Sequence, residues 1–149
     1  MSGNPHSFLF KPGLWLAEGS FSDGGGRRLD ARGSSEIRHE KRRWLNIGRL
    51  EVAGETALVF ENRCEIEPPS SFLEPVTWKA DNPSLGRLRG RFIVVEEAIL
   101  SAFATDDGTF GGSETMLRVD RDSYESMGYL ATAEETVVSR WRLRLTRVG

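Results

Sequence analysis

Hydrophobic and polar residues alternate with a period of two along most of the chain. In SRWRLRLTR (residues 139–147), arginines alternate with Trp141, Leu143 and Leu145. This period is typical of a β-strand that buries one face, because successive side chains of a strand point to opposite sides. Almost no segment has the i, i+3, i+4, i+7 spacing of apolar residues that marks an amphipathic helix. The pattern therefore predicts an all-β protein.

Short turn signals rich in glycine, aspartate, asparagine and proline separate the alternating segments. The segment PPSSFLEP, residues 68–75, is predicted to be irregular because proline cannot donate a hydrogen bond to a strand ladder. A short hairpin connection is expected at AGE, residues 53–55. About ten strands are predicted, at residues 13–21, 27–40, 42–52, 56–67, 76–80, 87–97, 98–105, 113–120, 123–131 and 136–148.

Many short strands joined mainly by hairpins indicate an antiparallel up-and-down arrangement. Closing such a sheet removes its two unpaired edges. We therefore predict a single antiparallel up-and-down β-barrel of about eight to ten strands, formed by residues 12–149 as one domain, with residues 1–11 as a loose N-terminal arm. Gly90 and Gly128, inside predicted strands, are expected at bends or bulges that turn the barrel wall.

Several classes of protein are disfavoured by the composition. The longest uncharged apolar run, AILSAFAT at 98–105, is far shorter than the ~20 residues of a membrane helix, and the strand at 27–40 lacks the apolar band of a membrane barrel. A net charge of −2 argues against a nucleic-acid partner. The N-terminus lacks the features of an export signal, and the single cysteine, Cys64, is expected to be a small buried residue. We expect a cytoplasmic protein with no membrane or nucleic-acid partner.

The segment GLWLAEG, residues 13–19, places a Gly-x-Trp at the start of the first strand, and the last strand carries arginines. This combination resembles the calycin superfamily: lipocalins, fatty-acid-binding proteins and nitrobindin-like heme barrels. In those families the early tryptophan closes one barrel end and a late arginine stacks across it. The resemblance implies the closing role for Trp15 and the stacking role for Arg140 or Arg142. A cation over an indole face contributes about 0.5–2 kcal/mol.

The chain departs from those families at three points. The nitrobindin-like barrels place a heme-ligating histidine in their C-terminal part, whereas the only histidines here are His6 and His39. No heme is therefore expected, and no other cofactor or metal is predicted, since no Cys/His cluster has metal-ligand spacing. SDGGG, residues 22–26, leads directly into the second strand, so the helical lid of fatty-acid-binding proteins is missing. The signal peptide and disulfides of secreted lipocalins are missing as well.

A barrel of this size holds one small ligand in its interior. If Trp141 and Leu143 face inward, the interior is apolar and the arginines are solvated; if the arginines face inward, they form an anion site. A mixed case has one arginine curling over the rim. Burying unpaired arginines costs several kcal/mol each, which favours the apolar interior. A second arginine strand, RLRGR at 87–91, could converge on the same anionic group. We expect a hydrophobic or amphipathic anion to be bound by residues among Trp15, Trp44, Arg89, Arg91, Tyr124, Tyr129, Arg140, Trp141 and Arg142.

Two other functions stay open. One is an enzyme, an isomerase or hydrolase of a hydrophobic substrate, that uses His39 or a buried glutamate; the strand glutamates considered are Glu18, Glu61, Glu65 and Glu97. No recognised catalytic motif is present, but catalytic groups of barrels come from scattered strands. The other is a structural protein with a filled core, whose outer apolar strand faces form a homodimer.

Overall fold

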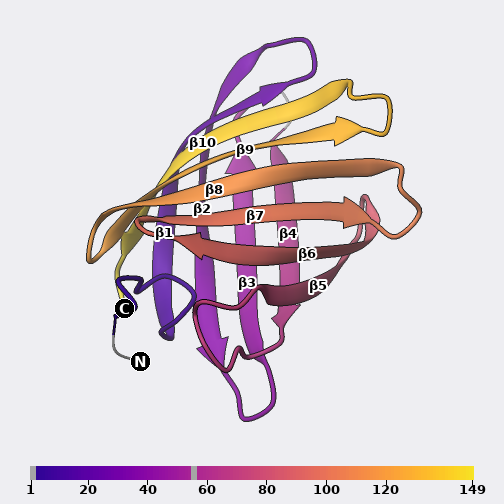
Figure 1. Ribbon diagram of the computed structural model, residues 1–149. Helices are drawn as coiled ribbons and strands as arrows, with labels where there is room; N and C mark the ends of the chain where they lie inside the picture. The colour runs from indigo at the N-terminus through magenta and orange to yellow at the C-terminus, as the bar shows by residue number, and fades with distance from the viewer. Residues whose placement is uncertain (1–2, 55–56) are drawn as a thin grey trace.

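A closed barrel of ten antiparallel strands makes up the described part of the chain (Figure 1). The structure is a computed structural model and describes residues 3–54 and 57–149. The strands are β1 (Gly13–Asp23), β2 (Arg28–His39), β3 (Trp44–Val52), β4 (Leu58–Ile66), β5 (Val76–Asn82), β6 (Gly86–Val95), β7 (Ala98–Thr105), β8 (Phe110–Asp120), β9 (Ser123–Thr132) and β10 (Val137–Arg147). No helix occurs among these residues, so the prediction of an all-β, up-and-down barrel is confirmed. The connection expected at 53–55 lies partly outside the described residues.

Each strand pairs with its neighbours in sequence, and β1 closes the ring against β10. The β1–β10 register runs from Trp15↔Arg147 to Asp23↔Ser139 without interruption. Gly19 lies where the two strands approach most closely, since a Cβ there would collide with the carbonyl of Arg142. In Figure 1 the strands β1–β4 run vertically behind, and β6–β8 cross them in front. The sheet therefore closes on itself, with β1–β4 on one side and β6–β8 on the other.

The seam between β4 and β5 is the shortest in the barrel. Their register contains three residue pairs, from Cys64↔Ala80 to Ile66↔Trp78. Residues 58–62 of β4 pair with β3 but have no strand partner on the β5 side within the described chain. The prolines of the 68–75 connection cannot donate to a ladder, which explains why the β4–β5 pairing stops at the end of β4 that leads into this connection.

The pairing registers show which side chains share the inner face. On β10, Ser139, Leu143 and Leu145 are buried, and Trp141 between them is partly buried; the arginines alternate on the outside. The apolar-interior orientation is therefore the observed one, and the orientation with inward arginines is wrong. The physical reason is the cost of removing guanidinium groups from water without partners.

The N-terminal arm is packed against one end of the barrel, which we call the sealed end. His6, Ser7, Phe8 and Leu9 are each at most 4% exposed. The carbonyl of Leu9 accepts a hydrogen bond from His39 Nε2 (2.9 Å). The expectation of a loose arm at residues 1–11 is therefore wrong for these residues, while residues 1–2 lie outside the described chain. The signal was present in the sequence as SFLF, residues 7–10, which is too apolar for a solvated arm.

Gly90 and Gly128 are not at bulges. Gly90 pairs with Trp78, and Gly128 pairs with Trp141, in uninterrupted registers. A Cβ at either glycine would lie 2.5 Å from the indole opposite it, so each glycine makes room for a tryptophan that lies across it. The registers shift elsewhere, between Val137 and Ser139 and between Arg118 and Asp120.

Candidate functional site

A carboxyl group lies inside the barrel at Glu114. The registers align Glu114 on β8 with Gly128 on β9, and Gly128 with Trp141 on β10. Because Gly128 has no side chain, the indole of Trp141 reaches across β9 and donates from Nε1 to Glu114 Oε2 (2.7 Å). Ser126, two residues before Gly128 and on the same face, donates from Oγ to the same oxygen (3.1 Å). Hydrogen-bond donors on β9 and β10 thus fix one oxygen of a carboxyl group on β8.

Burial raises the pKa of Glu114, and the hydrogen bonds from Trp141 and Ser126 oppose this rise in part. Both donors use Oε2. The second oxygen, Oε1, accepts no hydrogen bond from any described residue. An inward-facing, partly buried carboxyl with one free oxygen is an acceptor, or when protonated a donor, for a molecule inside the barrel.

Cys64 and Asn62 on β4 belong to the same inner face. Asn62 Nδ2 donates to Cys64 Sγ (3.0 Å). Burial raises the pKa of Cys64 to about 12, and the charge of Glu114 contributes to the rise, so the thiol and the carboxyl are close enough to interact electrostatically. Cys64 is therefore a neutral thiol at physiological pH and not a nucleophile. We call Asn62, Cys64, Glu114, Ser126 and Trp141 the interior polar cluster.

Four buried side-chain polar atoms have no hydrogen-bond partner among the described residues: Trp15 Nε1, Asn62 Oδ1, Trp78 Nε1 and Arg118 Nε. Of these, Asn62 Oδ1 is an acceptor in the interior polar cluster, and Trp78 Nε1 is a donor on the inner face. Trp78 lies beside Phe92 and Phe103, with ring centroids 6.0 and 6.2 Å away. A buried polar group without a partner costs about 1–3 kcal/mol. Such groups point to a partner that is not part of the chain.

Solvent reaches the inner face at the end of the barrel opposite the N-terminal arm. The β1–β2 turn (residues 24–27) lies at this end. Phe60 of β4 faces inward and contacts the ring of Phe21 on β1 (5.5 Å), yet it is 39% exposed. Leu58, also on the inner face, is 47% exposed. At the sealed end the inner residues Ile37 and Ile66 are at most 2% exposed. The interior is therefore closed at one end and accessible near the unpaired part of β4.

Four of the predicted site residues lie at the sealed end. Trp15 (1% exposed) packs edge-on against Tyr124 and Phe8, and the hydroxyl of Tyr124 lies 2.8 Å from His6 Nδ1. Trp44 stacks on His39 at 3.9 Å. These residues hold the arm in place. His39, the candidate catalytic residue of the alternative enzyme function, contacts Trp44 and the carbonyl of Leu9 in this arrangement.

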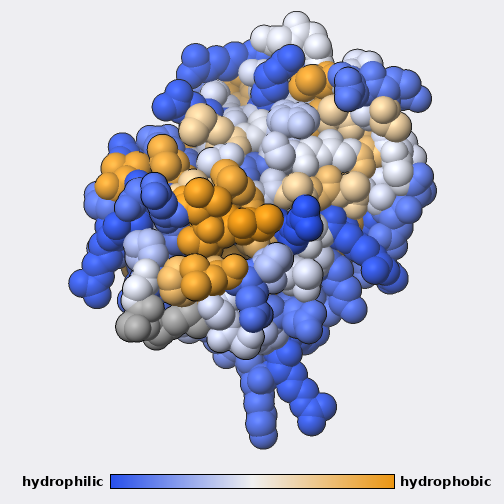
Figure 2. Space-filling model, in the orientation of Figure 1, coloured by the Kyte–Doolittle hydropathy of each residue, from blue (hydrophilic) through white to orange (hydrophobic). Residues whose placement is uncertain are grey.

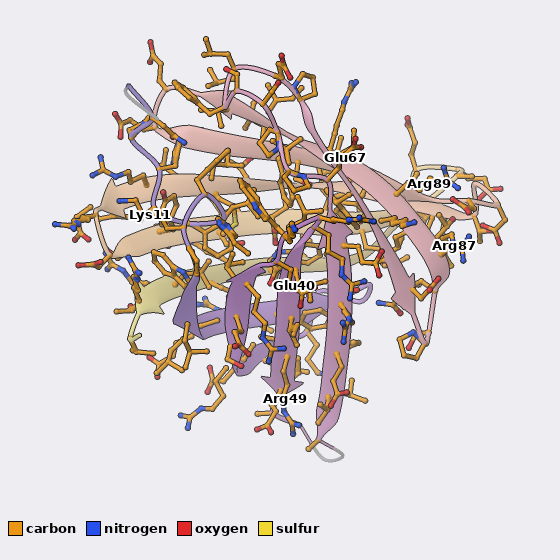
Figure 3. All side chains as sticks on the ribbon, turned by 90° about the horizontal axis from the view of Figure 1, so that it is seen from below. Lys11, Glu40, Arg49, Glu67, Arg87 and Arg89 are labelled. Atoms are coloured by element: carbon orange, nitrogen blue, oxygen red, sulfur yellow. The ribbon has the colours of Figure 1, made fainter. Side chains whose placement is uncertain are left out.

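The predicted arginines lie on the outer surface. Arg89 pairs with Asp106 (3.0 Å), and Arg142 lies 3.8 Å from Glu125; Arg91 and Arg140 are also exposed. Figure 3 shows Arg87 and Arg89 extending away from the barrel. The expectation that these arginines bind an anion in the interior is wrong, because the apolar side of each strand faces inward.

The stacking arginine of the calycin resemblance is also misplaced. Trp15 pairs across the closing seam with Arg147 and not with Arg140 or Arg142. The guanidinium of Arg147 donates to the carbonyl oxygens of Pro12 (3.1 Å) and Gly149 (3.3 Å).

Tyr129 faces outward and is 43% exposed. With Arg140 it lines a shallow groove of about 420 Å³ on the outside of β8–β10. Trp141 is the one predicted ligand-binding residue that belongs to the interior polar cluster.

Glu114 was not among the predicted carboxylates. Glu18 and Glu61 are exposed. Ion pairs join Glu61 to Arg49 (3.4 Å), Glu65 to Arg43 (2.7 Å) and Glu97 to Arg118 (3.5 Å). None of these four belongs to the interior polar cluster. The available signal was the spacing of Gly112, Glu114 and Met116, which places all three on one face of the strand. This signal is weak, because Met116 is the single large apolar residue among the three.

The described residues contain no group of three or more His, Cys, Asp or Glu that could hold a metal ion. Nor do they form a helix long and apolar enough to cross a membrane.

The fold and the interior polar cluster define a ten-stranded antiparallel barrel with a hydrogen-bonding carboxyl inside. No family model and no curated protein matches the chain. Among solved structures, it is similar to a protein of unknown function from the DUF3598 family of Nostoc punctiforme, with 9% identity, a TM-score of 0.35, and coverage of 99% of this chain and 100% of the other.

Two further structures show likenesses of the same order. An N-terminal dehydratase from the difficidin assembly line has 9% identity and a TM-score of 0.29, over 95% of this chain and 80% of its own. A protein provisionally named AttH from Nitrosomonas europaea has 10% identity and a TM-score of 0.30, over 99% of this chain and 56% of its own. At such TM-scores these likenesses carry no argument about what the chain does.

Proposed function

We propose that the barrel binds a small, largely apolar molecule whose polar head donates a hydrogen bond to Glu114. The observation that carries this proposal is the free Oε1 of a carboxyl held inside the barrel by Trp141 and Ser126. The two unpaired polar atoms of Asn62 and Trp78 support it, because a bound molecule would supply their missing partners. Ligand sites typically combine apolar walls with a few such polar groups.

The proposed ligand differs from the anion that the sequence favours. Its body would contact Trp78, Phe103 and Trp141, whose rings line the inner face. Its head would be a hydroxyl or an amine, since both donate hydrogen bonds. A carboxylate head would face the Glu114 carboxyl without an arginine to neutralise it. Placing two carboxyls at one site raises their pKa and weakens binding.

The route into the interior would pass the unpaired part of β4, where Leu58 and Phe60 present exposed apolar side chains. Binding would take place in the cytoplasm, as the lone, buried Cys64 suggests. We also infer a calycin-like architecture, supported by the position of Trp15 at the sealed end opposite Arg147 on the closing strand.

Three ligands with one alkyl chain test the proposal: decanol, decylamine and decanoate. Isothermal titration should show binding of decanol or decylamine and at least about tenfold weaker binding of decanoate. Glu114→Gln keeps an acceptor for Trp141 but directs an amide donor toward the ligand. It should therefore weaken binding of decylamine, whose ammonium head only donates, by about tenfold, whereas the hydroxyl of decanol can accept from the amide. Glu18→Gln, on the outer face, is the control. Tightest binding of decanoate, or equal affinities of wild type and Glu114→Gln for decylamine, would contradict the proposal.

A second candidate is acid–base catalysis by Glu114. The raised pKa of this buried carboxyl favours it, because catalytic acids are tuned in this way. Mass spectrometry and nuclear magnetic resonance of the ligand after incubation distinguish the two functions, because an isomerisation leaves the mass unchanged. A change of the ligand's mass or spectrum with wild type but not with Glu114→Gln would indicate catalysis, and an unchanged ligand with both proteins would indicate binding alone.

A further inference from the structure

Strand β4 has a free edge over residues 58–62. These residues pair with β3 on one side, and the pairing with β5 begins only at Cys64. In Figure 3 the β3–β4 hairpin, which carries Arg49, and the β5–β6 hairpin, which carries Arg87, extend in different directions, so β5 does not cover this edge. An unpaired strand edge presents backbone N–H and C=O groups to any strand that approaches it.

The backbone groups that face the gap belong to Val59 and Glu61. On the β5 side of the chain, the N–H of Glu67 donates to the carbonyl of Thr77 (3.0 Å). Successive residues of an antiparallel strand direct these groups to opposite neighbours, and the β3–β4 register is uninterrupted. The odd-numbered residues of β4 therefore point toward β5. Within the described chain, the backbone of Val59 and of Glu61 has no hydrogen-bond partner on this side.

The same edge exposes three successive large apolar residues. Leu58, Val59 and Phe60 are 47%, 47% and 39% exposed. Exposed apolar residues also gather on the outer face of β6–β8, toward the left of Figure 2, but those strands are paired on both sides and offer no free edge. Proteins usually protect a free edge with lysine, proline or a bulge, and residues 58–60 have none of these. The edge is therefore suited to pairing with another strand.

We propose that the free edge of β4 is the interface of a homodimer, in which the edges of two copies pair antiparallel and continue the sheet from one barrel into the other. A two-fold axis at Val59 places this residue opposite its own counterpart, where the two exchange both N–H···O=C bonds. It also places Leu58 opposite Phe60 of the second copy, at the closer spacing of a pair that is not hydrogen-bonded. Glu61 then meets Ala57 of the second copy and not its own counterpart.

The order of residues along the edge favours a second copy as the partner. The three apolar residues are centred on Val59, so a two-fold axis there places apolar residues opposite apolar residues. The same axis keeps the two Glu61 carboxylates from facing each other directly, whereas an axis at Glu61 would place them opposite each other. The second copy thus supplies both the missing backbone partners and matching side chains.

The dimer bears on the entrance to the barrel but not on the interior polar cluster. Leu58 and Phe60 lie at the entrance proposed for the ligand, so the paired edges would cover it and the ligand would enter the monomer. The oligomeric state is measured without any ligand. Failure of the dimer and failure of the proposed function are therefore separate results.

Sedimentation equilibrium of the whole chain tests the proposal. An edge contact of a few residues makes a small interface, so wild type should dimerise weakly, in the micromolar range. Val59→Pro removes the N–H on the axis without removing a bond to β3, and should raise the dimer dissociation constant at least about tenfold. Val59→Lys places two ammonium groups beside each other and should weaken the dimer by at least about tenfold as well. Leu16→Lys is the control, because Leu16 is similarly exposed (48%) but lies on β1, which is paired on both sides.

Circular dichroism confirms that each variant retains the barrel, and Val59→Lys carries the test alone if Val59→Pro does not. A wild type that stays monomeric at about 1 mM would overturn the proposal. Equal effects of Val59→Lys and Leu16→Lys would overturn it too.

Amide hydrogen exchange locates the interface. The N–H of Val59 should exchange more slowly as the protein concentration rises through the dissociation constant. The N–H of Phe60 points toward β3, so its exchange should not depend on concentration. A dimer in which Val59 exchanges as fast as in the monomer would place the interface elsewhere and overturn the proposal.

Discussion

Replacing Glu114 by glutamine tests the interior polar cluster without altering its shape. Glutamine has nearly the same volume, and its carbonyl oxygen accepts hydrogen bonds from Trp141 and Ser126 as Glu114 Oε2 does. The substitution removes the ability to ionise and places an amide donor where Glu114 has Oε1. Replacement by alanine, in contrast, leaves both donors without an acceptor. Each orphaned buried group costs about 1–3 kcal/mol, so Glu114→Ala should be destabilised by about 2–6 kcal/mol.

The sign of the pH dependence follows from the raised pKa. Burial raises the pKa of Glu114 in the folded state above the ordinary value of 4.5. Below that value the carboxyl is protonated in both states, and the free energy of unfolding is unaffected. Between the unfolded and folded pKa values the unfolded state releases its proton first, so wild-type stability falls as pH rises, by up to about 1.4 kcal/mol per pH unit. Glu114→Gln lacks this loss and should be the more stable protein above that window.

Urea unfolding of wild type, Glu114→Gln and Glu114→Ala at about pH 5 and about pH 8 measures this effect. The difference between Glu114→Gln and wild type isolates Glu114 from the other titrating groups, and Glu61→Gln, on the exposed part of β4, is the surface control. We expect the difference to grow in favour of glutamine as pH rises. An unchanged difference at the two pH values, or a glutamine variant as unstable as the alanine variant, would refute the placement of Glu114 in a buried, hydrogen-bonded cluster.

Three other substitutions or measurements test the sealed end, the interior wall and the thiol. His6→Ala removes two hydrogen bonds of the His6 ring and should lower the free energy of unfolding by about 1–3 kcal/mol at about pH 8. Burial lowers the pKa of His6, so the wild-type stability should fall as pH drops below the unfolded value of 6.5. Urea unfolding of His6→Ala should lack this pH dependence. Gly128→Ala places a Cβ 2.5 Å from the Trp141 ring and should lower the free energy of unfolding in urea by about 1–3 kcal/mol. Gly25→Ala, in an exposed turn, should change this free energy by less than about 0.5 kcal/mol. Equal losses in the two variants would contradict the packing of Trp141 across Gly128. Cys64, with a pKa raised to about 12, should react with a disulfide reagent at least about 100-fold more slowly in the folded protein than in urea, and rapid reaction of the folded protein would show that it is not buried.

Much of the fold follows from the period of two. The ten strands and their hairpin order were predicted because most segments carry clear alternation and short turn signals. The inward face of β10 was also readable, since Trp141 and Leu143 alternate with arginines, and burying unpaired arginines is unfavourable. These predictions succeeded because the two faces of the strand differ strongly in polarity.

The interior site was not predictable in the same way, because β8 has the opposite pattern. Leu117 and Val119 face solvent with 40% and 48% exposure, while Glu114 and Arg118 face inward. Alternation shows that the two faces of a strand differ in polarity. It identifies the buried face only when the other face is exposed to solvent. The role of Gly128 likewise depends on Trp141, a residue of another strand.

The nuclear magnetic resonance signals of the indole N–H groups test the central claim most directly. The four tryptophans give one indole signal each, and Trp141 and Trp78 belong to the inner face, whereas Trp15 and Trp44 are held at the sealed end. Titration with decylamine should shift the signals of Trp141 and Trp78, leave that of Trp44 in place, and have little effect on Trp141 in Glu114→Gln. Saturating decanol or decylamine that moves neither Trp141 nor Trp78 would contradict a ligand site at Glu114.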